Sequence, residues 1–129
     1  MSEPTLRPKV LIADDEKIIA DTLATILNQV GFDARAVYTC QNALELAAAF
    51  QPDVLISDVL MSDNNGFDAA VQIRSILPDI RVFLLSGQTA EMLEQTPARD
   101  LGFEVLVKPV HPQDLVSMLQ RAVPIKYAA

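Results

Sequence analysis

The chain has 129 residues, which fits one domain with one core and leaves little room for a second. Half of its residues are hydrophobic and 21% are charged, a balance that excludes an intrinsically disordered chain. The net charge of −7 disfavours direct binding to nucleic acid or to an anionic membrane, because both require positive charge. No apolar run reaches the length of a membrane span, residues 1–9 lack the apolar core of a signal peptide, and one cysteine, Cys40, cannot form an internal disulfide. We therefore expect a cytoplasmic protein.

Five segments of strand length occur along the chain. The first, third and fourth are continuous apolar runs, which is typical of parallel strands covered by helices on both faces. The second is mixed, because Asp33 and Arg35 alternate with apolar residues, and this pattern indicates an edge strand. The predicted strands are Lys9–Ala13, Phe32–Val37, Val54–Ser57, Arg81–Leu85 and Glu104–Val107.

Stretches with apolar residues at helical spacing separate these strands. The first runs from Glu16 to Val30, with Gly31 as a stop signal. Its apolar stripe consists of Ile19, Leu23, Ile26, Leu27 and Val30. The other predicted helices are Gln41–Phe50 with Thr39 as its cap, Phe67–Leu77, Thr89–Gln95, and one that begins after Pro112 and carries Leu115, Met118, Leu119 and Ala122. The fourth has the weakest signal, because Pro97 should end or kink it.

Strand and helix alternate five times in this reading. This order predicts an α/β domain with a parallel sheet, right-handed crossovers and helices on both faces. All strands of such a sheet end at one edge, and ligands bind at that edge. The residues that follow the strands are therefore the candidates for a functional site.

Polar residues stand at these strand ends. Asp14 and Asp15 follow the first strand and Asp58 follows the third. Ser86 follows the fourth strand and Lys108 the fifth. We expect the three carboxylates, the hydroxyl and the ammonium group to converge, although they are far apart in the sequence.

Three carboxylates placed together repel one another and raise each other's pKa values unless a cation intervenes. A hard divalent cation that prefers oxygen ligands suits them, which means Mg²⁺ or Mn²⁺. With the cation bound, the Lys108 ammonium and the Ser86 hydroxyl would meet the oxygens of a phosphoryl group, and an aspartate can act as the nucleophile. The residues thus favour phosphoryl transfer at this edge.

The chain resembles the receiver domain of two-component response regulators. The matching segments, in chain order, are VLIADDE, VLISDVLMSDNNG, VFLLS and VLVKP. The resemblance covers about residues 8–123, and it implies that residues 1–129 form a single receiver domain. It also implies a flavodoxin-like (βα)₅ fold, a doubly wound parallel five-stranded sheet with strand order 2-1-3-4-5.

The resemblance assigns roles to the residues at the sheet edge. It implies that Asp58 is the phosphoacceptor and that Asp14 and Asp15 form, with Asp58, the carboxylate ligands of Mg²⁺. The backbone carbonyl of Leu60 would complete the ligands from the protein. These assignments come from the family and not from spacing.

Three further positions match the family. Ser86 corresponds to the hydroxyl that contacts the phosphoryl group, and Lys108 to the lysine that pairs with it. The resemblance implies a cis bond between Lys108 and Pro109. Gly66 corresponds to a glycine of the loop after the acceptor.

Two positions depart from the family's pattern. Met61–Ser62 stand where Met-Pro is common, which would loosen the loop beside the metal. Val105 occupies the position of an aromatic switch residue, three residues before Lys108. Phe103 lies on the same side of the strand, and we do not expect it to take over that role. The departures concern the readout rather than the phosphorylation chemistry.

Each site residue also has an ordinary interpretation. Asp14 or Asp15 could cap the following helix, Asp58 and Ser86 could belong to turns, and Lys108 could be a solvated surface lysine. The functional interpretation depends on their occurrence together.

Other polar residues receive only structural interpretations. His111, the only histidine, is interpreted as a surface or capping residue rather than a phosphate donor. Cys40 is interpreted as an inert thiol, partly packed near a helix start. Residues 63–65 (Asp-Asn-Asn) are interpreted as turn residues without a metal role.

The sequence therefore predicts a signalling switch. A sensor histidine kinase or a histidine phosphotransfer protein would supply the phosphoryl group, and the change at Asp58 would alter the face built from the fourth helix and the fifth strand. The output would be altered binding of a downstream protein partner or a phosphorylation-linked homodimer. We expect no independent enzymatic turnover.

Three other functions stay open at this stage. An aspartyl phosphatase commonly needs a second aspartate two residues after the nucleophile, where this chain has Leu60. A nucleotide- or flavin-binding module needs a loop of backbone donors after the first strand, where this chain has Asp14-Asp15-Glu16. A phosphate-independent pseudo-receiver scaffold would not need the intact acidic set. The sequence also does not decide between a stand-alone receiver and a fragment of a longer protein.

Overall fold

The computed structural model describes residues 5–87, 100–123 and 126–127. Its main sheet has five parallel strands in the order β3-β2-β4-β5-β6, which is the order 2-1-3-4-5 when these strands are numbered along the chain. The strands are β2 (Lys9–Ala13), β3 (Asp33–Val37), β4 (Val54–Asp58), β5 (Arg81–Ser86) and β6 (Glu104–Val107). The predicted flavodoxin-like fold is confirmed, and β3 lies at an edge as the mixed pattern indicated.

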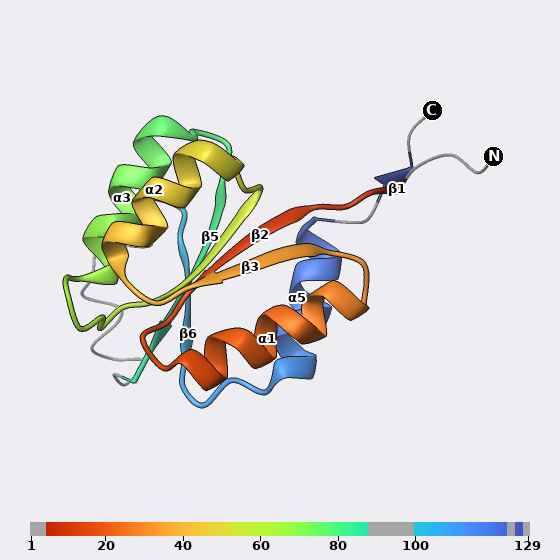
Figure 1. Cartoon of the computed structure of the whole chain (residues 1–129), viewed down its shortest axis with the longest axis horizontal. Helices are drawn as coiled ribbons and strands as arrows, with labels where there is room; N and C mark the ends of the chain where they lie inside the picture. The colour runs from red at the N-terminus through yellow and green to blue at the C-terminus, as the bar shows by residue number, and fades with distance from the viewer. Residues whose placement is uncertain (1–4, 88–99, 124–125, 128–129) are drawn as a thin grey trace.

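Helices cover both faces of the sheet (Figure 1). α1 (Lys17–Gln29) and α5 (Pro112–Ala122) pack on one face, around a core that contains Phe32 and Phe83. α2 (Cys40–Phe50) and α3 (Gly66–Ile76) pack on the other face. The predicted helix Thr89–Gln95 lies outside the described residues.

The predicted apolar stripe of α1 is wrong at its two ends. Ile19 is 46% exposed and Val30 is 37% exposed. Leu23 and Leu27 of the predicted stripe are buried, and the other buried side chains of the helix are Ala20 and Ala24. Alanines allow a helix to approach the sheet closely, so the buried face of α1 is centred on residues that are small as well as apolar.

Several element boundaries differ from the predictions by one residue. β4 and β5 each extend one residue further, so that Asp58 and Ser86 are the last residues of their strands. The first helix begins at Lys17 with Glu16 as its N-cap, and Glu16 makes no side-chain capping bond. Neither Asp14 nor Asp15 is therefore the N-cap of α1, which removes the capping interpretation of this pair.

Segments from near the two ends of the chain pair with each other outside the main sheet. β1 (Thr5–Leu6) runs antiparallel to β7 (Lys126–Tyr127), and Figure 1 shows this small ribbon at the upper right, beyond the amino end of β2. The sequence did not predict it, because a two-residue strand is too short to show a period.

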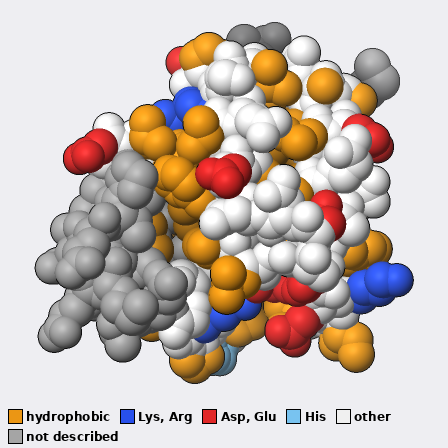
Figure 2. All heavy atoms as spheres, turned by 90° about the vertical axis from the view of Figure 1, so that its left-hand side faces the viewer, with side chains coloured by type: hydrophobic (Ala, Val, Ile, Leu, Met, Phe, Trp, Pro, Cys, Tyr) orange, Lys and Arg blue, Asp and Glu red, His pale blue; other side chains and the backbone are white. Residues whose placement is uncertain are grey.

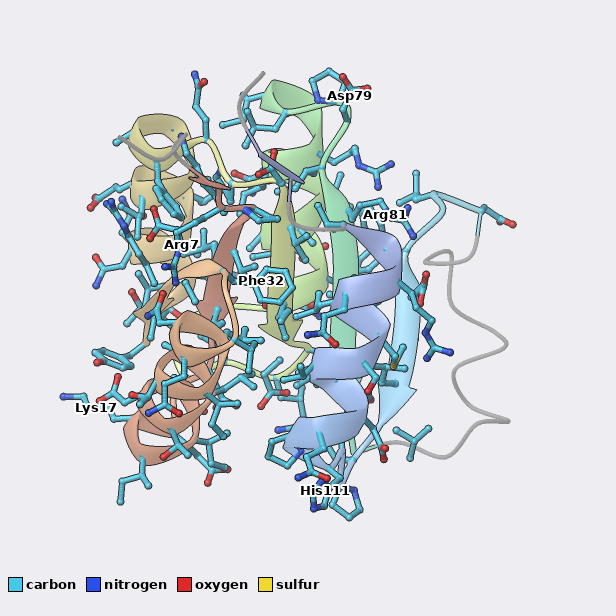
Figure 3. The ribbon with its side chains drawn as sticks, turned by 90° about the vertical axis from the view of Figure 1, so that its right-hand side faces the viewer. Arg7, Lys17, Phe32, Asp79, Arg81 and His111 are labelled. Atoms are coloured by element: carbon cyan, nitrogen blue, oxygen red, sulfur yellow. The ribbon has the colours of Figure 1, made fainter. Side chains whose placement is uncertain are left out.

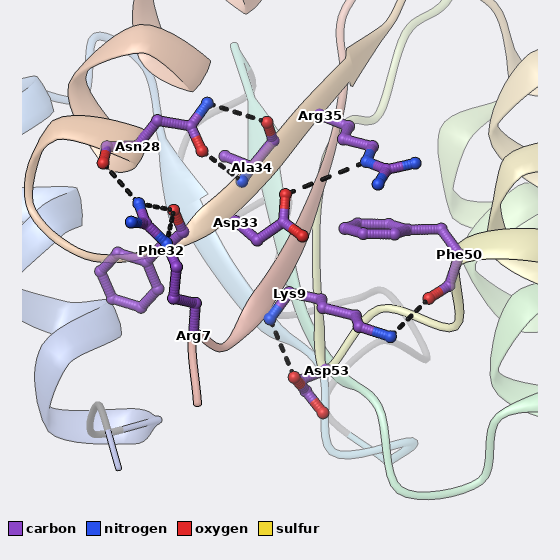
Figure 4. A network of polar contacts seen from close by, with 9 residues as sticks. All are labelled: Arg7, Lys9, Asn28, Phe32, Asp33, Ala34, Arg35, Phe50 and Asp53. Carbon is purple, nitrogen blue, oxygen red and sulfur yellow. Dashed lines mark hydrogen bonds and ion pairs between the residues drawn. The ribbon is translucent and has the colours of Figure 1, made fainter. Parts of the chain in front are cut away.

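Charged side chains at the amino ends of the strands have partners nearby (Figure 4). The backbone N–H of Lys9 donates to Asp53 Oδ2 at 2.9 Å, and Lys9 Nζ donates to the Phe50 carbonyl at 3.3 Å. The guanidinium of Arg7 donates to the Phe32 carbonyl at 2.6 Å. At this end of the sheet, the charged side chains thus pair with hydrogen-bond donors or acceptors of neighbouring segments.

The edge strand β3 is protected by a side chain from α1. The Asn28 amide donates to the Ala34 carbonyl at 3.0 Å and accepts from the Ala34 N–H at 2.8 Å. These two bonds satisfy backbone groups that an edge strand otherwise leaves open to pairing with another chain. The same side chain thus links α1 to the sheet margin (Figure 4).

The outer surface carries the acidic excess of the composition. Acidic side chains occur at several separate places on the face shown in Figure 2. Among the described residues, no helix has the length and apolar character needed to cross a membrane.

Candidate functional site

The three predicted carboxylates lie together at the carboxyl end of the sheet. In the neighbouring strands β2 and β4, Ala13 stands opposite Ser57. The next residues along the chain, Asp14 and Asp58, therefore lie side by side. One carboxylate oxygen from each of Asp14, Asp15 and Asp58 lies within 4.8 Å of the others. Asp14 and Asp58 are 3% and 7% exposed, and Asp15 is half-buried.

Electrostatic repulsion and burial act together on this cluster. The pKa of Asp14 is raised above its ordinary value, first by burial and further by the charges of Asp58 and Glu16. The hydrogen bond from the Glu16 N–H to Asp14 Oδ1, at 2.9 Å, and the charge of Lys108 oppose this rise in pKa only in part. Three hard oxygen donors at this spacing suit a divalent cation such as Mg²⁺.

Lys108 pairs with the central carboxylate. Its Nζ donates to Asp58 Oδ2 at 2.6 Å, and its side chain is 29% exposed. Burial lowers the pKa of Lys108, but the hydrogen bond to Asp58 and the charges of Asp58 and Asp14 outweigh it, so the pKa lies above its ordinary value. Lys108 is therefore a cation at neutral pH and offsets part of the negative charge.

Ser86 lies at the same level of the sheet. It is the last residue of β5 and is buried. Leu85, the residue before it, stands opposite Asp58 in the register of β4 and β5. The Ser86 carbonyl accepts the Lys108 backbone N–H at 2.7 Å, which holds the start of the following loop against β5. The predicted convergence of the five residues at one edge is thus observed, while the role of the Ser86 hydroxyl stays a prediction.

The loop after Asp58 is closely attached to the acceptor residue. The Leu60 N–H donates to Asp58 Oδ1 at 3.2 Å, and the Gly66 N–H donates to the Val59 carbonyl at 2.7 Å. A Cβ atom on Gly66 would overlap the backbone carbonyl of Asp58, so this position requires glycine. The role of the Leu60 carbonyl as a metal ligand stays a prediction.

Two resemblance-based expectations concern the last strand. The Lys108–Pro109 bond is cis, as predicted. Phe103 is buried, with its ring 6.0 Å from that of Phe67 and under the guanidinium of Arg74 at 5.0 Å. It forms part of the core beside α3, and the expectation that it does not serve as a switch aromatic stays a prediction.

Asp63 has a contact that the sequence did not predict. Its Oδ1 accepts the Cys40 N–H at 2.9 Å and its Oδ2 accepts the Gln41 N–H at 3.1 Å. Asp63 is therefore more than a turn residue, since it caps the N-terminus of a helix more than twenty residues earlier. No local pattern signals such a contact, because it depends on the packing of α2 beside α3.

The remaining two singled-out residues have structural roles. Cys40 is a buried free thiol, and burial, with the charge of Asp63 second, raises its pKa to about 11. His111 is the N-cap of α5, where its Nδ1 accepts the Gln113 N–H at 3.2 Å (Figure 3). The capping interpretation of His111 is confirmed.

Comparisons with known proteins point to one family. A family model described as the response regulator receiver domain matches residues 10–120. The chain is 34% identical over 113 residues to the DNA-binding transcriptional regulator NtrC of Azospirillum brasilense, covering 88% of this chain and 24% of that protein. It is 37% identical over 117 residues to the transcriptional regulatory protein PdtaR of Mycobacterium tuberculosis, covering 89% of this chain and 56% of that protein. The chain thus spans about a quarter of the first relative and about half of the second.

A solved structure shows the same fold over its whole length. The chemotaxis protein CheY4 of Vibrio cholerae matches with a TM-score of 0.81 and 29% identity, covering 91% of this chain and 99% of that one. The similarity therefore includes the sheet and its carboxyl-end edge.

Proposed function

Because the chain belongs to the response-regulator receiver domain family, we propose that it is a phosphorylation-activated signalling switch in which Asp58 accepts the phosphoryl group. The observation that carries the proposal is the position of Asp58. Its buried carboxylate lies beside those of Asp14 and Asp15 and is bound by the Lys108 ammonium at 2.6 Å. The carboxylate lies at the edge where parallel sheets bind ligands.

Receiver domains generally bind Mg²⁺, and the donors present here suit that ion. Asp14, Asp15 and Asp58 would hold it, with the backbone carbonyl of Leu60 as a further ligand, and Mn²⁺ could substitute. When bound, the ion would supply positive charge that offsets the oxygens of the incoming phosphoryl group.

The side chains of the protein divide the chemistry among them. A carboxylate oxygen of Asp58 attacks the phosphorus, the bond between phosphorus and the donor breaks, and its electron pair leaves with the donor. Lys108 exchanges its contact with the Asp58 carboxylate for one with the transferred group, and Ser86 offers a hydroxyl to a phosphoryl oxygen. The product is an acyl phosphate that water later hydrolyses, so the domain has no independent turnover.

Receiver domains accept phosphoryl groups from sensor kinases. The donor proposed for this chain is accordingly a sensor histidine kinase or a histidine phosphotransfer protein in the cytoplasm. Phosphorylation would add negative charge at the sheet edge and change the affinity for a downstream protein or for a second copy of the chain.

The deciding experiment is intact mass spectrometry after incubation with acetyl phosphate. We expect a single phosphoryl adduct on the wild type that requires Mg²⁺, and none on Asp58→Asn. Asp53→Asn is the matched control, because Asp53 directly precedes β4 and so lies at the opposite end of this strand from Asp58. It should form the adduct as the wild type does. A wild type that binds Mg²⁺ yet forms no adduct, even with a phosphorylated histidine donor, would favour the phosphate-independent scaffold.

A further inference from the structure

The loop of residues 59–65 carries part of the proposed cation site, and backbone hydrogen bonds hold its two ends in place. The Val59 N–H donates to the Leu85 carbonyl at 3.0 Å, and the Gly66 N–H closes the loop onto the Val59 carbonyl at 2.7 Å. Leu60 and Asn65 form an isolated antiparallel bridge across it. These contacts fix the base of the loop and leave residues 61–64 beyond them.

From this outer part, Asp63 reaches a different element. Both of its carboxylate oxygens accept backbone N–H groups at the start of α2, those of Cys40 and Gln41, at 2.9 and 3.1 Å. Thr39 takes the next two, because its Oγ1 accepts the Asn42 N–H and its carbonyl accepts the Ala43 N–H. The first three N–H groups of α2, which have no intrahelical acceptor, thus have side-chain partners. Two of the three depend on Asp63.

The start of α2 is itself attached to the other half of the cation site. The Asp14 N–H donates to the Val37 carbonyl at 3.1 Å, and only two residues separate Val37 from Cys40. Asp63 therefore links the loop that follows Asp58 to the segment that borders Asp14. The two halves of the site come from strands β2 and β4, and this link is a second connection between them outside the sheet.

We propose that Asp63 is a positioning residue for the cation site, which holds the loop that carries Leu60 at a fixed distance from Asp14 and Asp15. This inference rests on the proposed function. The positioning role requires a carboxylate at residue 63, because both oxygens of Asp63 are used as acceptors. The pKa of Asp63 lies below its ordinary value, chiefly because of the Cys40 N–H hydrogen bond, so the group is ionised at neutral pH. Ser62 lacks the fixed φ of a proline, so the loop depends more on this side-chain link.

The test separates positioning from helix capping by means of a matched variant. Thr39→Ala removes a capping bond from the same end of α2 without touching the loop. Mg²⁺ affinity of the unphosphorylated proteins is measured by isothermal titration calorimetry, and stability by thermal unfolding without Mg²⁺. We expect both Asp63→Ala and Thr39→Ala to lower the unfolding temperature. Only Asp63→Ala should weaken Mg²⁺ binding, by about tenfold, the scale seen when a group that orients a metal ligand is lost.

Kinetics supply an independent readout. Asp63→Ala should need more Mg²⁺ for half-maximal phosphorylation by acetyl phosphate and should reach the wild-type rate when Mg²⁺ is saturating. Asp63→Asn, which keeps one acceptor oxygen, should lie between the wild type and Asp63→Ala, and it serves as the test variant if Asp63→Ala does not fold.

Two results would overturn the inference. One is Mg²⁺ affinity in the Asp63 variants equal to that of the wild type, and the other is an equal loss of affinity in Thr39→Ala. If the wild type itself neither binds Mg²⁺ nor accepts a phosphoryl group, the proposed function fails. If the wild type does both and the Asp63 variants match Thr39→Ala, only the positioning role fails.

Discussion

At the amino ends of the strands, charged groups meet complementary partners, whereas at the carboxyl ends three carboxylates lie together beside a single lysine contact. Lys9, Asp53 and Arg7 illustrate the first arrangement (Figure 4). Asp14, Asp15 and Asp58, with Lys108 bound to one of them, form the second. Both ends are built on the same parallel strands, so the difference does not come from the fold.

The difference shows which end is organised for stability and which for ligand binding. Like charges held together lower the stability of the folded chain unless a ligand compensates them. Three carboxylates at the edge where ligands bind therefore lower the folding stability of the chain until a ligand compensates their charge. The following predictions test whether this contrast is real.

Burial and the nearby carboxylates at the carboxyl end should together slow the reaction of the Cys40 thiol. Burial and the charges of Asp63 and Asp15 raise its pKa from 9.0 to about 11. Since only the thiolate is nucleophilic, alkylation near pH 8 should be about a hundredfold slower than for an ordinary cysteine, and the rate should rise with pH until the pH approaches that pKa. Iodoacetamide labelling followed by mass spectrometry gives the rate, with the unfolded chain in guanidinium as the control. Equal rates in the folded and unfolded chains would contradict the raised pKa.

Lys108→Ala should produce the next largest effect. It leaves the buried Asp58 carboxylate without its cation, and we expect a loss of about 2 kcal/mol in the free energy of unfolding, less than for a fully buried pair because Lys108 is partly exposed. Arg81→Ala is the matched control at the amino end (Figure 3), where the Arg81–Glu104 pair is 3.5 Å long and about half exposed. It should cost about 0.5 kcal/mol or less. Equal losses in urea unfolding would remove the contrast between the two ends.

The carboxyl end was also the part that the sequence predicted best. Asp14, Asp58, Ser86 and Lys108 each come after an apolar run of strand length, and parallel strands bring such positions to one edge whatever their separation in sequence. The strands were predictable from their apolar runs and their alternation with helices, whereas the strand order came from the resemblance to the receiver family.

What the sequence did not predict depends on contacts between distant segments. Asp63 has the local pattern of a turn residue, and its role at α2 arises only when α2 and α3 pack together. The pairing of β1 with β7 likewise follows from where the fold brings the two segments. The exposure of Ile19 shows a related limit, because periodicity marks an apolar stripe but does not decide how the helix is rotated against the sheet.

Asp14→Asn should have a smaller effect on stability than Lys108→Ala, and its sign is the most informative. Without Mg²⁺ we expect the free energy of unfolding to rise by about 1 kcal/mol, the usual size of a single-site effect, because one of three repelling charges is removed while the side-chain oxygen can still accept the Glu16 N–H. With Mg²⁺ the order should reverse, since the wild type gains stability from binding the ion and the variant gains less. Urea unfolding in EDTA and in Mg²⁺ measures both.

Asp53→Asn at the amino end is the control, because its carboxylate accepts the Lys9 N–H and has no part in the cluster. It should lower stability equally in both conditions. If Asp14→Asn also lowered stability without Mg²⁺, repulsion would not be the dominant force at the carboxyl end, and the acidic cluster would have to be understood as a set of structural hydrogen bonds like those at the opposite end.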